Sequence, residues 1–473
     1  MKKISLPALI LLIAFVLLLS VSADTSKKLA FSYEIETPSE ITSPLAGIQD
    51  GKYTSKLTLE AGNILRMKTE NAAWINIKFY GSAPTSYTLA VINDGDAENA
   101  QTLEPGGTGF LHEVTKLPVC DEIMLTSNER MMIAEIELYS DGTLPSTVQQ
   151  WEKSLSKCDI LVISTHSDDD TLFFGALTAE QAAKGRLIQT AFICSHSEEL
   201  HRLNEMLDGQ WTLGVTAYPI VGTFYDHYST SLAGAEKQFD SQAMSEYIVE
   251  CIRRTRPQVL VTHDINGEYG HGAHRLTSKL TREALDICAD SSVYPESAEK
   301  YGVHEPLKTY IHLYKQNEII LNVRASLDEL GNATPFSVAE DAYDCHVSQQ
   351  KWDFAVTTRG TNDCRRFGLF KTLVDCDVTD TDIMNGVTPV FPPVSATSSM
   401  NSDNTVRNIS SRSTLMHTDS NVFEPFSFFS HDGNGHETKV PKSSVAICFV
   451  ILMVLAASAL AVSIRNLIRN KRS

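Results

Sequence analysis

Hydrophobic and polar residues alternate with a period of two through the first part of the chain. Trp74–Phe79 and Ile133–Leu138 show this alternation most clearly. It is typical of strands that bury one face. Turn-forming sequences separate such runs at Asn93-Asp94-Gly95, Pro105-Gly106-Gly107 and Asp141-Gly142. We therefore predict an all-β, jelly-roll-like sandwich over residues 24–148.

From residue 149 the pattern changes to short apolar runs followed by longer amphipathic segments. The apolar runs are Ile160–Ile163, Leu187–Cys194 and Val259–Thr262, which have the character of buried parallel strands. The segments after them predict helices over residues 172–184, 198–213 and 275–288. This alternation predicts an α/β domain over residues 149–380, with a Rossmann-like, mostly parallel sheet covered by helices.

The two ends of the chain carry signals for export and for membrane attachment. Residues 1–23 have a basic start, an apolar middle and small residues at the end, which predicts a secretory signal peptide, with an uncleaved anchor as the alternative. Residues 444–464 are apolar and long enough to form a single transmembrane helix, and residues 465–473 form a basic tail. Basic flanks stay in the cytoplasm, so the folded part is expected on the cell surface or another extracytoplasmic membrane face.

Composition predicts one flexible segment and argues against one class of partner. Residues 381–443 are rich in Ser and Thr and predict a flexible stalk. The formal net charge of −18 argues against nucleic acid as a partner, because phosphate binding needs a basic face.

There are nine cysteines, of which Cys448 falls in the predicted membrane helix. The other eight can pair in an oxidising compartment or remain buried thiols, as Cys194 and Cys251 suggest by their apolar surroundings.

A group of acidic residues and a histidine follows the first predicted strand of the α/β domain. The sequence reads Thr165-His166-Ser167-Asp168-Asp169-Asp170 and then enters a helix. Loops at the carboxyl ends of parallel strands gather at the ligand crevice of such sheets. A single aspartate here would need no role beyond capping the helix. Three carboxylates with a histidine repel one another unless a cation offsets their charge, which favours a metal or acid–base site.

A second loop after a strand carries two closely spaced histidines. After Thr262 the chain reads His263-Asp264-Ile265-Asn266-Gly267-Glu268-Tyr269-Gly270-His271-Gly272-Ala273-His274. Two such loops on one sheet edge favour convergence on one site. Two histidines and a carboxylate with an open position form a recurring catalytic zinc set. Zinc lowers the pKa of bound water to about 7 and polarises a carbonyl, as the hydrolysis of an amide requires.

These two segments resemble the PIG-L/LmbE-like N-deacetylases, a family that includes N-acetylglucosaminyl-phosphatidylinositol de-N-acetylases. The family pattern is His-Pro-Asp-Asp-Glu after a strand and Gly-His-Pro-Asp-His later in the chain. Here they stand as His166-Ser167-Asp168-Asp169-Asp170 and Gly270-His271-Gly272-Ala273-His274. The likeness covers roughly residues 157–375 and includes Arg202-Leu203-Asn204-Glu205 and Asp344-Cys345-His346-Val347-Ser348-Gln349.

The resemblance implies a role for each matching position. It makes His166, Asp169 and His274 the zinc ligands, although the same donor set also accepts Fe²⁺. It makes Asp168 the general base and His271 the partner of the oxyanion and potential acid. It implies that Tyr269 contacts the tetrahedral intermediate and that Arg202 binds substrate. Asp226 is also implied to bind substrate, because an aspartate near this position in the family holds sugar hydroxyls.

Other readings of some of these residues remain open. Arg202 can instead form a surface ion pair with Glu205 or Glu198, and Asp226 can be a solvated loop residue. His346 either lines the site or lies on a helix surface. Glu268 and His263 are expected to support the ligands or the loop.

Three positions depart from the family pattern. Ser167 replaces a proline, which loosens the loop, and Asp170 replaces a glutamate by a shorter acid. Ala273 replaces an aspartate that tunes the partner of His271 in the family, so this chain lacks the carboxylate that supports the acid half of the family's mechanism.

The function expected from these segments is metal-dependent hydrolysis of an N-acetyl group on an N-acetylglucosamine-type sugar or a surface glycan. The β-sandwich resembles galactose-binding, discoidin-like jelly rolls, which implies glycan binding, while a structural spacer is the alternative. If it binds glycan, deleting residues 24–145 should spare activity on a small sugar. The other functions left open are a surface adhesin with an inactive α/β domain and a zinc amidase that acts on another amide.

Overall fold

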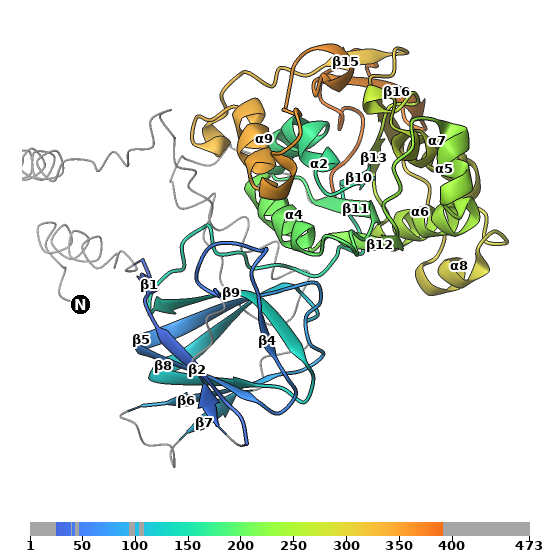
Figure 1. Cartoon of the computed structure of the whole chain (residues 1–473). Coiled ribbons are helices and arrows are strands. Elements are labelled where there is room, and N and C mark those ends of the chain that lie inside the picture. Colours follow the sequence, from blue (N-terminus) through green and yellow to red (C-terminus); the bar gives the residue numbers. More distant parts are fainter. Residues whose placement is uncertain (1–24, 39, 43–46, 94–99, 104–107, 391–473) are drawn as a thin grey trace, which may run out of the picture. The chain divides into compact units, whose positions relative to one another are not determined.

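The computed structural model describes residues 25–390, apart from residue 39 and residues 43–46, 94–99 and 104–107 (Figure 1). The predicted signal peptide, the membrane helix, the basic tail and all of the stalk beyond residue 390 lie outside these residues. Within the described part, no helix has both the length and the apolar composition that crossing a bilayer requires.

The first region consists of antiparallel strands joined by hydrogen bonds into one network. The two strands predicted most clearly lie inside β5 and β9, which pair with each other. This network shows antiparallel β-structure, and the arrangement as a jelly-roll sandwich stays a prediction. The strands are β1 Lys28–Leu29, β2 Ser32–Glu36, β3 Ile41–Thr42, β4 Leu57–Leu59, β5 Ile64–Phe79, β6 Thr88–Ile92, β7 Gln101–Leu103, β8 His112–Thr126 and β9 Met131–Ser140.

The second region is built on a sheet with the strand order β12-β11-β10-β13-β14-β16-β15. The strands from β12 to β14 are parallel, while β16 is antiparallel to β14 and β15 is antiparallel to β16. The predicted α/β fold with a mostly parallel sheet is therefore confirmed. The strands are β10 Ile160–Ser164, β11 Ile188–Cys194, β12 Ile220–Phe224, β13 Val259–Thr262, β14 Lys308–His312, β15 Glu318–Ile320 and β16 Arg366–Thr372.

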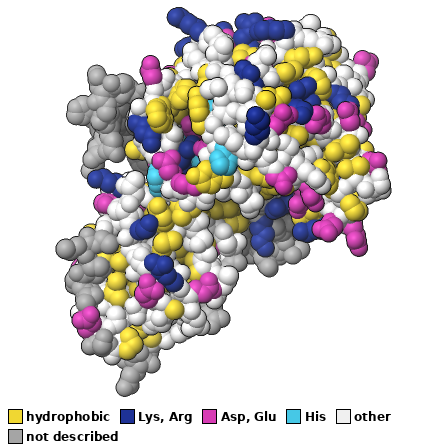
Figure 2. Space-filling view, turned by 45° about the vertical axis from the view of Figure 1, so that its right-hand side comes forward, with side chains coloured by type: hydrophobic (Ala, Val, Ile, Leu, Met, Phe, Trp, Pro, Cys, Tyr) yellow, Lys and Arg dark blue, Asp and Glu magenta, His cyan; other side chains and the backbone are white. Residues whose placement is uncertain are grey.

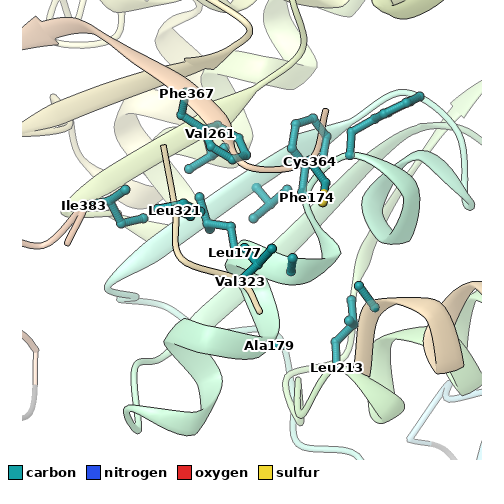
Figure 3. Close-up of a cluster of buried hydrophobic side chains, with 14 of the residues drawn as sticks. Phe174, Leu177, Ala179, Leu213, Val261, Leu321, Val323, Cys364, Phe367 and Ile383 are labelled. Carbon is teal, nitrogen blue, oxygen red and sulfur yellow. The ribbon is translucent and has the colours of Figure 1, made fainter. Parts of the chain in front are cut away.

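Helices cover both faces of this sheet, as its apolar strands require (Figure 1). Alternate residues of β10 face opposite layers: Ile160 and Val162 pack in one cluster, and Leu161 and Ile163 in the other. The first cluster contains residues of α9 and of α3, among them Leu177 and Ala179 (Figure 3), and the second contains residues of α6 and α7. The helices are α2 Asp169–Leu172, α3 Gly175–Ala183, α4 His201–Thr212, α5 Leu232–Gln238, α6 Ser241–Thr255, α7 Gly272–Ile287, α8 Pro295–Tyr301 and α9 Pro335–Asp344. Short 3-10 turns are η2 Glu268–Gly270, η3 Asp328–Leu330, η4 Val347–Gln349 and η5 Gly360–Asn362.

Helix α4 joins the two regions. Leu203, Met206, Leu207 and Trp211 on this helix share one apolar cluster with the buried residues of the β-region. Polar contacts reinforce the junction, since the Tyr53 hydroxyl donates to Asp208 over 2.7 Å. Both regions fall within one compact unit, so they share a core across this helix.

Several details differ from the predictions. The predicted helix at 172–184 is two helices, α2 and α3, because Phe173 and Phe174 break it and bury their rings completely. Ile383 and Met384, which the sequence places in the stalk, are buried in the core of the α/β region. All eight cysteines of the described residues are free thiols. The molecular face in Figure 2 mixes hydrophobic, acidic and basic side chains.

Candidate functional site

The candidate site lies where the carboxyl ends of the parallel strands meet. His166 follows β10, Asp226 follows β12, and His263 follows β13. The chain leaves β10 toward β11 on one side, while β13 lies on the other, so the strand order reverses at this point. Ligands bind at such switch points in open α/β sheets, because the loops there separate and leave a crevice.

Three atoms from two distant loops form a small triangle. His166 Nδ1 lies 2.8 Å from Asp169 Oδ2 and 3.1 Å from His274 Nε2, and His274 Nε2 lies 3.0 Å from Asp169 Oδ2. The side chains are almost fully buried. The structure therefore brings together the three residues that the sequence nominates as metal ligands.

The opposite nitrogen of each histidine already has a carboxylate partner. His166 Nε2 lies 3.1 Å from Asp226 Oδ1, and His274 Nδ1 lies 2.9 Å from Glu268 Oε2. Metal-binding histidines commonly donate their second N–H to a carboxylate in this way, which fixes the ring and leaves the other nitrogen as a lone-pair donor. Asp226 therefore contacts a candidate ligand, and the alternative of a solvated loop aspartate is wrong.

Glu268 holds three imidazoles and is itself completely buried. Besides His274, it accepts hydrogen bonds from Nδ1 of His263 over 2.8 Å and from Nδ1 of His312 over 2.7 Å. The supporting role expected for Glu268 and His263 agrees with these contacts. His312 was not nominated from the sequence. Its position at the end of the buried strand β14 is the signal that would have found it.

Several overlapping groups of side chains in the described residues have the spacing of metal ligands, with ligand atoms within 4.8 Å of one another. These groups are His166/His271/His274, His166/Cys194/Asp226 and Asp169/His263/His274. His263 has no free nitrogen, because Nε2 accepts from the Thr165 amide over 2.9 Å and Nδ1 binds Glu268. Burial raises the pKa of Cys194, which keeps it a thiol. The triangle of His166, Asp169 and His274 is the donor set that fits a divalent cation with a position left open.

The charges of the site are balanced within the cluster. Burial works against the charged form of His166, but the carboxylates of Asp226 and Asp169 raise its pKa well above the ordinary value. Burial likewise opposes charge on His274, while Asp169 and Glu268 raise its pKa to about 9. Without a cation, these imidazoles attract protons into the triangle. A divalent cation bound in the triangle would neutralise the same carboxylate charges in place of these protons.

Asp168 lies beside this triangle and is held by Arg202. The Arg202 Nη2 donates to Asp168 Oδ1 over 3.1 Å, and Nη1 lies 3.7 Å from both Asp226 and Glu199. Burial raises the pKa of the Asp168 carboxyl against the opposing effect of Arg202. Arg202 is buried and makes no ion pair with Glu205, which instead accepts from the amide and hydroxyl of Ser348. The surface-ion-pair alternative for Arg202 is therefore wrong.

His271 and Tyr269 border the open side of the triangle. The His271 ring centroid lies 5.0 Å from that of His166 and 4.6 Å from that of His274, and its Nδ1 has no hydrogen-bond partner. Burial, together with the neighbouring imidazoles, lowers the pKa of His271 to about 3. Burial raises the pKa of the Tyr269 hydroxyl, so both groups are neutral at pH 7.

The loop that carries these two residues has an unusual backbone. Tyr269 has φ 44° and ψ 19°, a left-handed conformation that costs energy for a residue with a Cβ. A Cβ on Gly272 would lie 2.4 Å from the carbonyl oxygen of Ser231, so only glycine fits where α7 begins. Helix α7 begins at Gly272, before the predicted start at residue 275, so His274 lies in its first turn.

Two other residues of the predicted site are buried behind it. Asp170 accepts a hydrogen bond from Gln210 through Oδ2, while its Oδ1 has no partner. His346 is fully buried and neither of its ring nitrogens has a partner, so the alternative of a helix-surface histidine is wrong. His196, which sequence reasoning did not nominate, accepts from the Ser167 amide over 3.1 Å. It follows β11 and braces the loop that carries His166.

Residues 161–285 match the family model described as PIG-L, GlcNAc-PI de-N-acetylase. This PIG-L segment runs from β10 into α7 and contains both loops that form the triangle. The predicted likeness to that family is therefore confirmed for the central part of the α/β region.

Two curated relatives align with part of this chain. Both are named 1D-myo-inositol 2-acetamido-2-deoxy-alpha-D-glucopyranoside deacetylase. The one from Streptomyces griseus is 30% identical over 166 residues, which is 29% of this chain and 51% of the relative. The one from Streptomyces scabiei is 26% identical over 190 residues, which is 34% of this chain and 58% of the relative. The chain thus spans about half the length of these curated relatives.

A solved structure also matches part of this chain. It is the N,N'-diacetylchitobiose deacetylase from Pyrococcus horikoshii, with 16% identity and a TM-score of 0.32. The match covers 40% of this chain and 70% of that chain.

Proposed function

We propose that this protein hydrolyses the N-acetyl group of an amino sugar with the help of a divalent cation, most simply Zn²⁺. The observation that carries the proposal is the triangle of His166 Nδ1, Asp169 Oδ2 and His274 Nε2, with atoms 2.8–3.1 Å apart. Two histidines and one carboxylate with an open position form a catalytic rather than a closed structural site.

A bound cation would acidify a water molecule and polarise the acetyl carbonyl. Asp168 is placed to accept the proton that this water loses on attack, because its carboxylate lies beside the triangle without belonging to it. Arg202 holds Asp168 Oδ1 and so fixes the direction of the carboxylate. As the C–O bond forms and the C–N bond breaks, that proton passes to the leaving nitrogen. The products are acetate and the free amine.

In this proposal, His271 and Tyr269 act on the other side of the reacting carbon. Neutral N–H and O–H groups can donate to the oxygen on which negative charge develops, and such donors typically contribute about 10²–10³ in rate. The unpartnered Nδ1 of buried His271 fits a group that finds its partner in the substrate. Ala273 offers no carboxylate beside His271, so we assign the proton delivery to Asp168.

The substrate class rests on the relatives. The two curated relatives are named for deacetylation of a 2-acetamido-2-deoxy-glucopyranoside, which is an N-acetylated amino sugar. We extend this class to the present chain because both catalytic loops fall within the matched segment. The predicted signal peptide and membrane helix would place the site outside the cytoplasm, where a surface or external glycan is the substrate that it meets.

Acetate release tests the proposal directly. The full chain is loaded in turn with Zn²⁺ and Fe²⁺, its metal content is measured, and acetate is assayed on a panel of N-acetylated sugars. We expect acetate from at least one N-acetylglucosamine compound with one equivalent of metal bound, and none after chelation. The His166→Ala variant serves as the matched inactive protein. A folded, metal-loaded chain that released no acetate from any N-acetylated sugar would overturn the proposal.

A further inference from the structure

Exposed aromatic side chains gather around the candidate site. Across the described residues of 25–390, the Phe, Tyr and Trp side chains that are largely exposed are four. They are Tyr225, Tyr228, Tyr269 and Trp352, with exposed fractions of 45%, 71%, 41% and 56%. Large aromatic rings are costly to leave in water, and their concentration in one place marks a binding surface.

Tyr225 and Tyr228 lie on one side of the triangle. The Tyr228 ring centroid is 5.2 Å from that of His271, with the planes at 68°. Tyr225 directly precedes Asp226, whose Oδ1 contacts His166. The Tyr228 ring therefore stands next to His271, and the Tyr225 ring, 4.5 Å from that of His227, belongs to the same loop.

Trp352 lies on another side of the site, because Phe354 and Lys351, which flank it in the sequence, contact residues there. Two residues later, the Phe354 ring lies 5.0 Å from that of Tyr269. One residue earlier, Lys351 Nζ lies 3.5 Å from Glu199, which itself lies 3.7 Å from Arg202. The segment that carries Trp352 thus runs from the Arg202 side of the site to Tyr269.

We propose that Tyr225, Tyr228 and Trp352 are stacking platforms for sugar rings on either side of the hydrolysed residue, and that the substrate is an oligosaccharide. This inference rests on the proposed function and specifies its substrate class. A pyranose presents an apolar C–H face and a rim of hydroxyls. The exposed rings supply area for the apolar face, and burying part of a ring against that face favours binding.

The polar groups between the rings favour a sugar over an acyl chain. Glu199, Lys351 and Asp226 are partly exposed beside the aromatic residues, with side-chain exposed fractions of 40%, 53% and 28%. An acyl chain laid across them would remove charged groups from water without hydrogen bonds, which is costly. Sugar hydroxyls can both donate to the carboxylates and accept from the ammonium group.

Chain-length dependence of the reaction tests this inference. The Zn²⁺-loaded full chain is assayed on N-acetylglucosamine, N,N'-diacetylchitobiose and the corresponding tetrasaccharide. We expect kcat/KM to rise with chain length. In Trp352→Ala and Tyr228→Ala the value on the tetrasaccharide should fall about tenfold, mainly through KM, and by more than on the monosaccharide. Ile320→Ala, which removes an exposed apolar side chain on the edge strand β15, is the matched control and should change neither. Equal kcat/KM for all lengths, or equal losses on the monosaccharide and the tetrasaccharide, would overturn the inference.

A binding measurement separates this inference from the proposed function. The tetrasaccharide is titrated into Asp168→Asn, alone and combined with Trp352→Ala, by calorimetry. We expect binding that the Trp352 substitution weakens about tenfold, whether or not the wild-type protein releases acetate. Binding that is unchanged by the substitution, or preferential binding of an alkyl glucoside through its chain, would overturn the aromatic platform and leave the deacetylase proposal standing.

Discussion

Glu268 Oε2 lies 2.9 Å from Nδ1 of His274, in a place where neither side chain touches solvent. The same carboxylate accepts from His263 and His312, so one buried negative charge orients three imidazoles. Burial opposes the charged form of Glu268, but the imidazoles that donate hydrogen bonds to its carboxylate lower its pKa well below the ordinary value. The direction of the His274 lone pair therefore depends on this one carboxylate.

The substitution Glu268→Gln should weaken metal binding. The amide would turn an N–H₂ group toward a ring N–H, so at least one of the three imidazoles loses its partner. We expect metal affinity to fall about 10- to 100-fold, as measured by competition with a chromogenic chelator. Glu283→Gln, an exposed change on α7, the helix that carries His274, is the control and should bind metal as the wild type does. Unchanged affinity in Glu268→Gln would show that His274 needs no such support.

Asp168→Asn separates metal binding from the reaction. The side chain keeps its size and its place beside Arg202 but can no longer accept the proton from water. We expect normal metal content and a kcat lower by about 10²- to 10⁴-fold. The comparison with Asp169→Asn, which we expect to lose metal as well as rate, distinguishes the base from the ligand. A metal-loaded Asp168→Asn protein that is as fast as the wild type would remove Asp168 from the mechanism.

Metal removal should destabilise the α/β region. Without the cation, buried Asp169 and the two histidines keep their charges and protons in a site with little access to water. Binding to the folded state alone stabilises it by about 4 kcal/mol at a thousand times Kd. We therefore expect chelation to lower Tm by several degrees, with recovery on adding Zn²⁺. His166→Ala should show neither the loss nor the recovery, and an equal response in that variant would place the stabilising metal elsewhere.

His112 makes the junction at α4 sensitive to acid. Its Nδ1 lies 2.6 Å from Gln149 Oε1 and its Nε2 lies 2.9 Å from Asn204 Oδ1, and burial with nearby Lys78 lowers its pKa to about 4. The neutral ring therefore stabilises the fold fully above the unfolded pKa near 6.5, and this contribution is lost as the pH falls toward 4.

The expected loss at His112 is about 2 kcal/mol by pH 5. Thermal unfolding at pH 7.5 and pH 5 measures it, with His112→Gln as the variant that has no proton to gain. The wild type should lose more Tm between the two pH values than the variant does. An equal loss of Tm in the two proteins would show that protonation of His112 does not affect the stability of the fold.

Deleting residues 24–145 should unfold the remainder rather than spare it. The hypothesis that the β-region binds glycan predicted that this deletion would weaken activity on a polymer and spare activity on a small sugar. The structure instead places Leu203, Met206, Leu207 and Trp211 of α4 in a cluster shared with the β-region. Exposing four such side chains costs several kcal/mol at about 1.5–3 kcal/mol each. We expect an aggregated or unfolded product by size-exclusion chromatography and circular dichroism. A soluble, monodisperse truncated chain that binds Zn²⁺ would contradict this expectation.

The sequence alone predicted the central strands of the α/β region and the local half of the site. Strands over residues 160–163 and 259–262 follow from apolar runs, since burial on both faces demands them. The pairing of His166 with Asp169 is equally local, because three residues separate them at a strand-to-helix turn. Patterns of this kind are set by neighbouring residues, so they can be predicted without knowledge of the fold.

The tertiary structure decided which distant side chains meet. Nothing in the pattern indicated that His312 shares a carboxylate with His274, that Asp226 faces His166, or that Arg202 holds Asp168. These contacts depend on the order of strands in the sheet and on the packing of α4 between two regions. Strand order depends on how much apolar surface the whole chain buries, and no short segment of sequence determines that amount.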